Sequence, residues 1–175
     1  MNHLKTLLLL LVLWIASPDV CTARSAVATH EAAQAMATIA IAGVKFAAAG
    51  STGIDEPAMR CYASLQPSIL HDAFSVRMEE SMSTADMEKV DRFYASALGK
   101  RFVSFAIARK IGMPTDPDDF TKEEQDRAFA FTRTVEANKL FDLFLPDDPE
   151  LVQLLVDIMK REVERCTNSS AEQKE

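Results

Sequence analysis

Two segments with capped starts and apolar residues at helical spacing most constrain what this chain can fold into. Ser83 opens a Ser-x-x-Asp pattern, and Thr121 opens a similar pattern that ends at Glu124. Patterns of this kind are typical of a helix N-terminus. Behind each start, apolar side chains recur at steps of three and four residues, which places them on one helix face. We therefore predict two long amphipathic helices, over 83 to about 111 and over 121 to about 144.

The composition favours helices in the rest of the chain as well. Only five glycines, two tyrosines and one tryptophan occur in 175 residues. Sheets favour β-branched and aromatic residues and need turns, whereas Ala, Met, Leu, Glu and Lys favour helices. Hydrophobic residues make up 48% of the chain, which is enough for a core and argues against wholesale disorder. An all-α fold follows.

The remaining helices are bounded by turn-forming residues. Glycine ends helices and proline begins or interrupts them. We expect further helices over 30–49, about 57–65, 67–82 and about 150–166, separated by the breaks at 50–53, 112–114 and 146–149. The predicted architecture is a helical bundle of five to six helices, centred on an antiparallel pair made by the two long ones.

The N-terminus has the layout of a secretory signal peptide. A short polar start with Lys5 precedes an unbroken apolar run over 7–15, and Cys21-Thr22-Ala23 places small residues before Arg24. This arrangement is typical of a cleavable signal. A membrane span needs about 20 apolar residues, and the run is too short for one. Asp19 stands close before Cys21, which disfavours a lipoprotein signal.

This layout divides the chain into three parts. We predict a signal peptide at 1–23, a helical domain at 24–166 and a disordered polar tail at 167–175. After cleavage no stable membrane anchor remains. The net charge of −7 and the pI of about 5.0 cause repulsion from phosphate backbones and anionic lipid surfaces. We therefore expect no nucleic-acid partner.

Two cysteines remain after the expected cleavage, Cys61 and Cys166. An even number of cysteines in an exported chain usually means disulfides. The bond would close a loop of about 105 residues, which contributes about 4 kcal/mol in the chain-entropy model. A redox pair is the alternative, but the close C-x-x-C spacing that lowers a thiol pKa is absent. We predict a structural disulfide between Cys61 and Cys166.

The two long segments align with each other at an offset of 38 residues. Capping, aromatic and small positions coincide: Ser83 with Thr121, Asp86 with Glu124, Phe93 with Phe131, Ser96 with Thr134, Gly99 with Ala137 and Arg101 with Lys139. Only the phenylalanine is identical among these, so internal duplication is one hypothesis and two unrelated capped helices is the other. In both segments an aromatic residue is followed by small residues at i+3 and i+6, which predicts a face that another helix can approach closely. We interpret Gly99 as a sign of tight packing, because a mid-helix glycine costs about 1 kcal/mol relative to alanine.

The first segment also resembles a known family. Its run Phe93-Tyr94-Ala95-Ser96-Ala97-Leu98-Gly99-Lys100-Arg101 is similar to the Phe-Tyr-x-Ser-Pro-x-Gly-x-Lys core of the bacterial domain-of-unknown-function 2059 family. The resemblance covers about 82–102 and extends more loosely to the next helix. Ala97 and Arg101 stand where the family often has proline and lysine. It implies an exported, helical, periplasmic protein in which Phe93, Tyr94, Ser96, Gly99 and Arg101 are structural motif positions, and it brings no catalytic residue.

The chain offers few residues in patterns that carry chemistry. His30 and His71 are the histidines left after cleavage, and no H-E-x-x-H, paired C-x-x-C or calcium-loop pattern occurs. We therefore expect no metal, no cofactor and no catalytic residue. His71 and Asp72 could act as a base with its carboxylate, but adjacent helix positions point in different directions. The segment 50–53 lacks the lysine of a phosphate-binding loop.

Three functional hypotheses remain. The first is a non-enzymatic periplasmic protein that binds another periplasmic or exported protein, for example an immunity-type partner of an exported toxin. An uncovered apolar patch on the last helix would favour it. The second is a carrier of an apolar small molecule in the helical core, and the third is a hydrolase that uses His71. A cavity for the carrier would be lined by methionines and phenylalanines that otherwise form plain core: Met78, Met82, Met87, Phe129, Phe131, Phe141 and Phe144.

Overall fold

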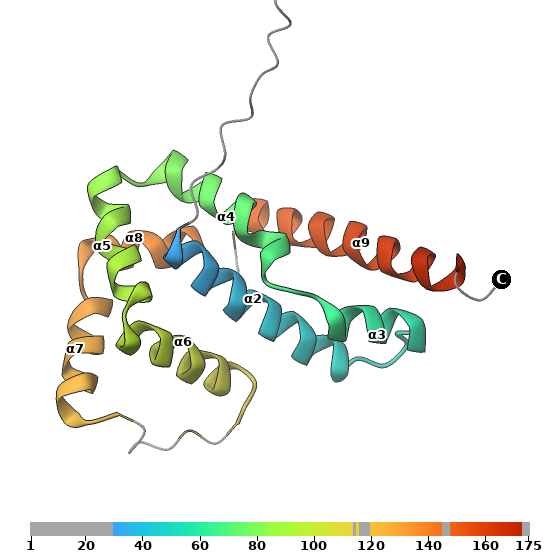
Figure 1. The fold of residues 1–175 in the computed structure, drawn as a ribbon, viewed down its shortest axis with the longest axis horizontal. Helices are drawn as coiled ribbons and strands as arrows, with labels where there is room; N and C mark the ends of the chain where they lie inside the picture. The colour runs from blue at the N-terminus through green and yellow to red at the C-terminus, as the bar shows by residue number, and fades with distance from the viewer. Residues whose placement is uncertain (1–29, 114, 116–119, 145–147, 173–175) are drawn as a thin grey trace, which may run out of the picture.

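The computed structural model describes residues 30–113, 115, 120–144 and 148–172. These residues form eight α-helices and no strand (Figure 1). The helices are α2 (Glu31–Ala49), α3 (Glu56–Ser64), α4 (Ser68–Ser81), α5 (Thr84–Ala95), α6 (Ala97–Lys110), α7 (Lys122–Thr132), α8 (Val135–Leu143) and α9 (Pro149–Glu172). The all-α prediction is confirmed. The predicted signal peptide at 1–23 and its cleavage site lie outside the described residues.

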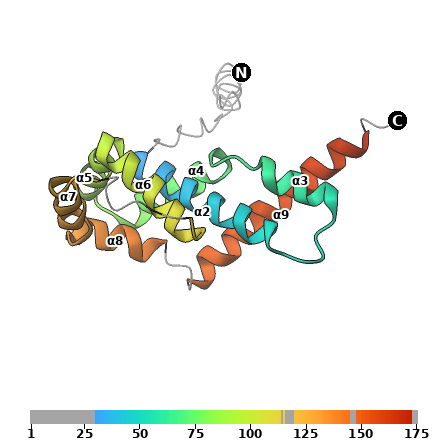
Figure 2. The same cartoon turned by 90° about the horizontal axis from the view of Figure 1, so that it is seen from below.

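Helix α2, and not the predicted pair, is the centre of the molecule. It packs against α3, α4, α5 and α6 and runs between the two ends of the fold, with α5–α8 at one end and α3 with the end of α9 at the other (Figures 1 and 2). By length and mean hydropathy (19 residues, 1.4) this helix could cross a membrane. Seven of its residues are buried, five of them alanines, so in this structure it serves as the core helix of the domain.

Both predicted long helices are broken, which corrects the predicted bundle of five to six helices. The first break lies at Ser96 between α5 and α6, and the second lies at Arg133–Thr134 between α7 and α8. Ser96 has an extended backbone (φ −70°, ψ 157°), and its hydroxyl accepts a hydrogen bond from Gly99 N at 3.0 Å. A side chain that caps a new helix in this way favours a corner over a continuous helix.

The two corners are built alike. The Ser96 hydroxyl donates to Phe93 O (2.6 Å), and the Thr134 hydroxyl donates to Phe131 O (2.9 Å). Thr134 also accepts from Ala137 N at 3.2 Å, as Ser96 accepts from Gly99. The small residues at i+3 and i+6 therefore make a helix–corner–helix unit. The prediction that they line one helix face is wrong.

Gly99 is required by the close approach of the chain at its corner. A Cβ atom at this position would lie 2.1 Å from Phe93 O and 2.7 Å from Tyr94 Cα. Both are backbone atoms, which cannot move without opening the corner. The tight packing inferred at Gly99 is confirmed, although its neighbour is the preceding helix of the same chain and not a separate one.

The two helix–corner–helix units pair with each other in a reciprocal way. The rings of Phe93 and Phe131 stack with centroids 3.6 Å apart and planes 5° apart. Arg101 binds Glu124 (2.6 Å) and Lys139 binds Asp86 (2.7 Å). Exchange of the two units converts one of these ion pairs into the other and returns the phenylalanine pair to itself. We call α5–α8 the quasi-symmetric unit, because such reciprocity is the property of a two-fold interface.

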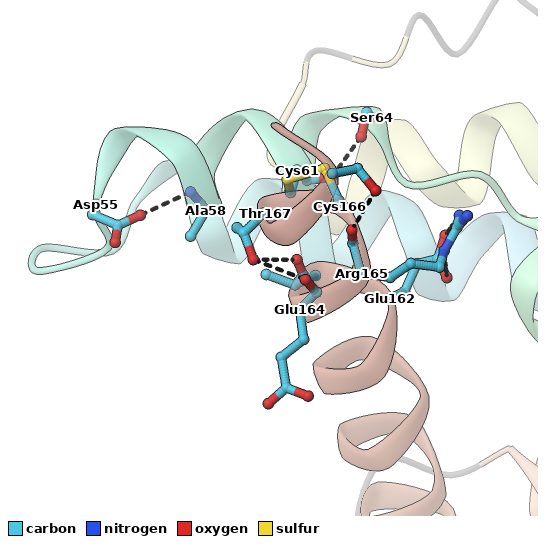
Figure 3. Close-up of a disulfide and its surroundings, with 11 residues drawn as sticks. Asp55, Ala58, Cys61, Ser64, Glu162, Glu164, Arg165, Cys166 and Thr167 are labelled. Carbon is cyan, nitrogen blue, oxygen red and sulfur yellow. Dashed lines mark hydrogen bonds and ion pairs between the residues drawn. A yellow bond between two sulfur atoms is a disulfide. The ribbon is translucent and has the colours of Figure 1, made fainter. Parts of the chain in front are cut away.

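The predicted disulfide is present and joins α3 to α9. Cys61 and Cys166 are bonded, with their Cα atoms 5.8 Å apart (Figure 3). Helix α9 continues past Cys166 to Glu172, so a disordered tail beginning at residue 167 is wrong for residues 167–172. The hydroxyls of Thr167 and Ser169 donate to carbonyls of the preceding turn, Val163 O and Arg165 O, which satisfies these polar side chains within the helix.

Candidate functional site

An apolar groove lies between α6 and α7. Its volume is about 450 Å³. The lining is mostly apolar and rich in aromatic side chains: Phe102, Phe105, Ala106 and Arg109 from α6, and Phe120, Gln125, Ala128, Phe129 and Thr132 from α7 and the residue preceding its cap. We call this feature the α6–α7 groove.

Phenylalanine rings form the walls of the α6–α7 groove. The rings of Phe105 and Phe120 meet edge to face, with centroids 5.5 Å apart. The side chain of Phe129 stands open to solvent at 60% exposure. Both helices are positioned by the quasi-symmetric unit, because the Arg101–Glu124 ion pair joins α6 to α7. The groove is therefore a preformed apolar surface held by ordered helices.

Two arginines place positive charge beside these rings. The guanidinium of Arg101 lies 4.8 Å from the centre of the Phe120 ring, and that of Arg109 lies 6.0 Å from the centre of the Phe105 ring. Arg101 is held by Glu124. The pKa of Glu124 lies below its ordinary value, first because Thr121 N donates to it and then because Arg101 is close. Arg109 is exposed, and no carboxylate of the described residues forms an ion pair with it.

The residues on which the family resemblance rests support this surface and do not line the groove. Phe93, Ser96 and Gly99 build the corner, and Arg101 bridges the two units. Tyr94 is 2% exposed, and its hydroxyl has no hydrogen-bond partner in the part of the chain that the structure describes. Burial raises the pKa of this hydroxyl well above its ordinary value of 10.0, so it stays neutral.

A second apolar surface lies on the last helix. Val152 and Val156 of α9 are one turn apart, and their side chains are 42% and 52% exposed. An uncovered patch on this helix is the feature expected of an interaction protein. This patch contains no aromatic residue, since α9 carries none.

The structure does not bring together His71 and Asp72, the two residues of the hydrolase hypothesis. His71 and Asp72 both lie on α4, and no hydrogen bond joins their side chains among those of the described residues. The described residues also include no group of three or more His, Cys, Asp or Glu side chains that could hold a metal ion. The acidic residues at 116–119 lie outside the described residues. Asp148 pairs with Arg77 and caps α9 by accepting from Glu150 N at 2.9 Å, so it has a structural role.

One polar cluster was not predicted from the sequence. His30 Nδ1 lies 2.6 Å from Asp91 Oδ2, and its Nε2 lies 3.5 Å from Glu79 Oε1. The other oxygen of Asp91 accepts from Ala32 N at 2.9 Å. Asp91 thus ties the start of α2 to α5. No short-range pattern could reveal this, because His30 and Asp91 are 61 residues apart.

Most side chains proposed to line a carrier cavity are plain core. Met78, Met82 and Met87 are buried in the hydrophobic core. Phe131 stacks on Phe93, and Phe144 packs on Phe74 with centroids 4.6 Å apart. Only Phe129 of that set lines the α6–α7 groove.

Searches of protein-family models, of curated proteins and of solved structures find no match to this chain.

Proposed function

We propose that this chain is an exported, non-enzymatic protein that binds an apolar segment of another protein in the α6–α7 groove. The observation that carries the proposal is the groove itself, with Phe129 exposed at its mouth and phenylalanine rings along its walls. Contiguous apolar patches on soluble proteins mark interaction sites, whereas isolated exposed apolar residues need no explanation. Aromatic residues and arginine are also enriched at interaction surfaces.

The chemistry of the groove supports binding over catalysis. General acid–base catalysis needs a titratable group within hydrogen-bond reach of the reacting atom. The groove offers an arginine, an amide and a threonine hydroxyl among its polar side chains, and arginine does not titrate near neutral pH. Such a lining suits recognition of an apolar group accompanied by a negative charge.

Export to the periplasm is part of the proposal. It is supported by the signal layout at 1–23 and by the Cys61–Cys166 disulfide, because disulfides persist in oxidising compartments. We further propose membership of the bacterial domain-of-unknown-function 2059 family, supported by the resemblance over 82–102. An immunity-type partner of an exported toxin remains one concrete form of the function.

The test is a matched pair of substitutions in the protein purified after export. Phe129→Asp places a charge in the groove, and Val135→Asp places the same charge on α8 at a side chain that is 66% exposed and outside the groove. We expect the wild-type protein to form a stable complex with one extracytoplasmic protein on size exclusion, Phe129→Asp to lose it and Val135→Asp to keep it. Equal complex formation by both variants, or no complex with the wild type, would contradict the proposal.

An apolar small molecule is the second candidate occupant. Its support is the groove volume of about 450 Å³, which lies in the range of small-molecule sites, about 300–1,000 Å³, together with Arg109 as a partner for a carboxylate. Native mass spectrometry of the exported protein distinguishes the candidates. A bound apolar acid that is lost in Phe129→Asp would favour the carrier, and a clean spectrum would favour the protein partner.

A further inference from the structure

The quasi-symmetric unit contains a second copy of the α6–α7 surface. Exchange of the two units places α6 on α8 and α7 on α5, at the offset of 38 residues. The groove residues Phe102, Phe105, Phe120, Ala128 and Thr132 then correspond to Leu140, Leu143, Met82, Val90 and Tyr94. The counterpart of the α6–α7 groove is therefore the surface between α5 and α8.

That counterpart surface is covered by helices. Met82, Val90, Tyr94 and Leu140 are all buried in the main core, and Leu143 packs against it. The cover comes from α2, which packs on α5, and from α4, which packs on α5 and α8. The same kind of surface thus occurs twice in the molecule. One copy holds two helices of the chain itself, and the other copy is the open α6–α7 groove.

The two copies carry charges of opposite sign, a carboxylate in the covered copy and a guanidinium in the open copy. At the covered copy Asp91 accepts from Ala32 N and so holds the positive N-terminal end of α2. The residue that corresponds to Asp91 in the open copy is Phe129, which is apolar. The nearby charge there is Arg109, a cation that no carboxylate of the described residues pairs with. A helix in the open copy would consequently be held by a negative group.

We propose that the α6–α7 groove accepts an amphipathic helix of a second protein, with an apolar face on the phenylalanine rings and a carboxylate on Arg109. This inference rests on the proposed function and adds the conformation and charge of the occupant. Helix-in-groove binding is a common mode of peptide recognition. Its support here is internal, since the same scaffold already binds helices at its other copy.

The experiment uses two designed helical peptides that share one alanine–leucine face. One is flanked by glutamates and the other by lysines, and each carries a fluorophore for anisotropy titration against the exported protein. We expect the glutamate peptide to bind the wild type more tightly than the lysine peptide. Arg109→Glu should weaken the glutamate peptide by about tenfold or more, which corresponds to about 1.4 kcal/mol, and should strengthen the lysine peptide. Val135→Asp should bind like the wild type.

The outcomes separate the two proposals. If neither peptide binds, or if Arg109→Glu leaves the peptide preference unchanged, the helix-with-carboxylate inference is overturned. The proposed function survives that result if Phe129→Asp still abolishes the complex with the natural partner. If the natural complex persists in Phe129→Asp, the groove is not the interaction site and both proposals fail.

Discussion

Gly99→Ala tests the corner on which the quasi-symmetric unit depends. In an ordinary helix the change from glycine to alanine adds about 1 kcal/mol of stability. At Gly99 the new methyl carbon would lie 2.1 Å from Phe93 O, far inside van der Waals contact. Because Phe93 O is a backbone atom, the steric clash can be relieved only if the corner between α5 and α6 opens.

The magnitude follows from what an opened corner loses. Two hydrogen bonds of Ser96 hold the corner, one from its hydroxyl to Phe93 O and one from Gly99 N, each contributing about 1 kcal/mol. Overpacking of a closed site costs a further 1–3 kcal/mol or more, as an order of magnitude. The gain in helix propensity of about 1 kcal/mol offsets part of these losses. We therefore expect Gly99→Ala to lower the free energy of unfolding by about 3 kcal/mol.

Urea unfolding followed by far-ultraviolet circular dichroism measures this difference. The matched control is Gly43→Ala in α2, where the new methyl carbon meets only the end of the Lys110 side chain, with Lys110 Cε at 2.8 Å. That flexible chain can move aside, so Gly43→Ala should stabilise the protein by up to about 1 kcal/mol. If Gly99→Ala is neutral or stabilising, the reasoning about the corner is refuted.

Three further changes test other parts of the structure. Tyr94→Phe removes a buried hydroxyl that has no partner among the described residues and should raise the free energy of unfolding by about 1 kcal/mol; a loss of stability would show that the hydroxyl is satisfied. Replacement of both Cys61 and Cys166 by serine opens a loop of 105 residues and should lower the unfolding free energy by about 4 kcal/mol, whereas an unchanged melting temperature would contradict that. The pKa of Asp86 is lowered, chiefly by its hydrogen bond from Lys139, and that of Glu124 is lowered, chiefly by Thr121 N. These lowered pKa values mean that the two ionised carboxylates stabilise the folded state. The stabilisation is fully present at pH values above the ordinary pKa values of 3.8 and 4.5, and it is lost as pH falls through the pKa values of the folded state. The acid limb of a pH–stability profile should therefore flatten in a Lys139→Met, Arg101→Met variant, which removes the Lys139 donor to Asp86 and the Arg101 charge beside Glu124.

Helix content was predictable from the sequence, but the corners were not. Ser96 and Thr134 sit at positions where helical periodicity continues on both sides, so the apolar pattern alone reads as one helix. Serine and threonine are common N-caps, and a second cap within each segment was the available signal. It is weak, because neither corner has the acidic residue at i+3 that marks the starts at Ser83 and Thr121. The offset of 38 residues was the better guide, since it aligned both corners and both ion pairs.

The groove depends on which side of the quasi-symmetric unit the rest of the chain covers. Phe102 and Phe105 have the same three-residue spacing as their counterparts Leu140 and Leu143. Only the path of α2 and α4 decides that the leucines pack in the core and the phenylalanines line a groove. That path is set by long-range contacts such as the one between Ala32 N and Asp91, which leave no local pattern. The disulfide was predictable because cysteines are few and their pairing has one solution.

Hydrogen–deuterium exchange of the purified protein, with and without a partner protein that it binds, locates the binding surface. We expect partner binding to slow exchange in α6 (97–110) and α7 (122–132) and to leave α3 and α9 unchanged. Protection confined to α9 around Val152 and Val156, with no change at α6 or α7, would contradict it and would assign the interaction to the valine patch.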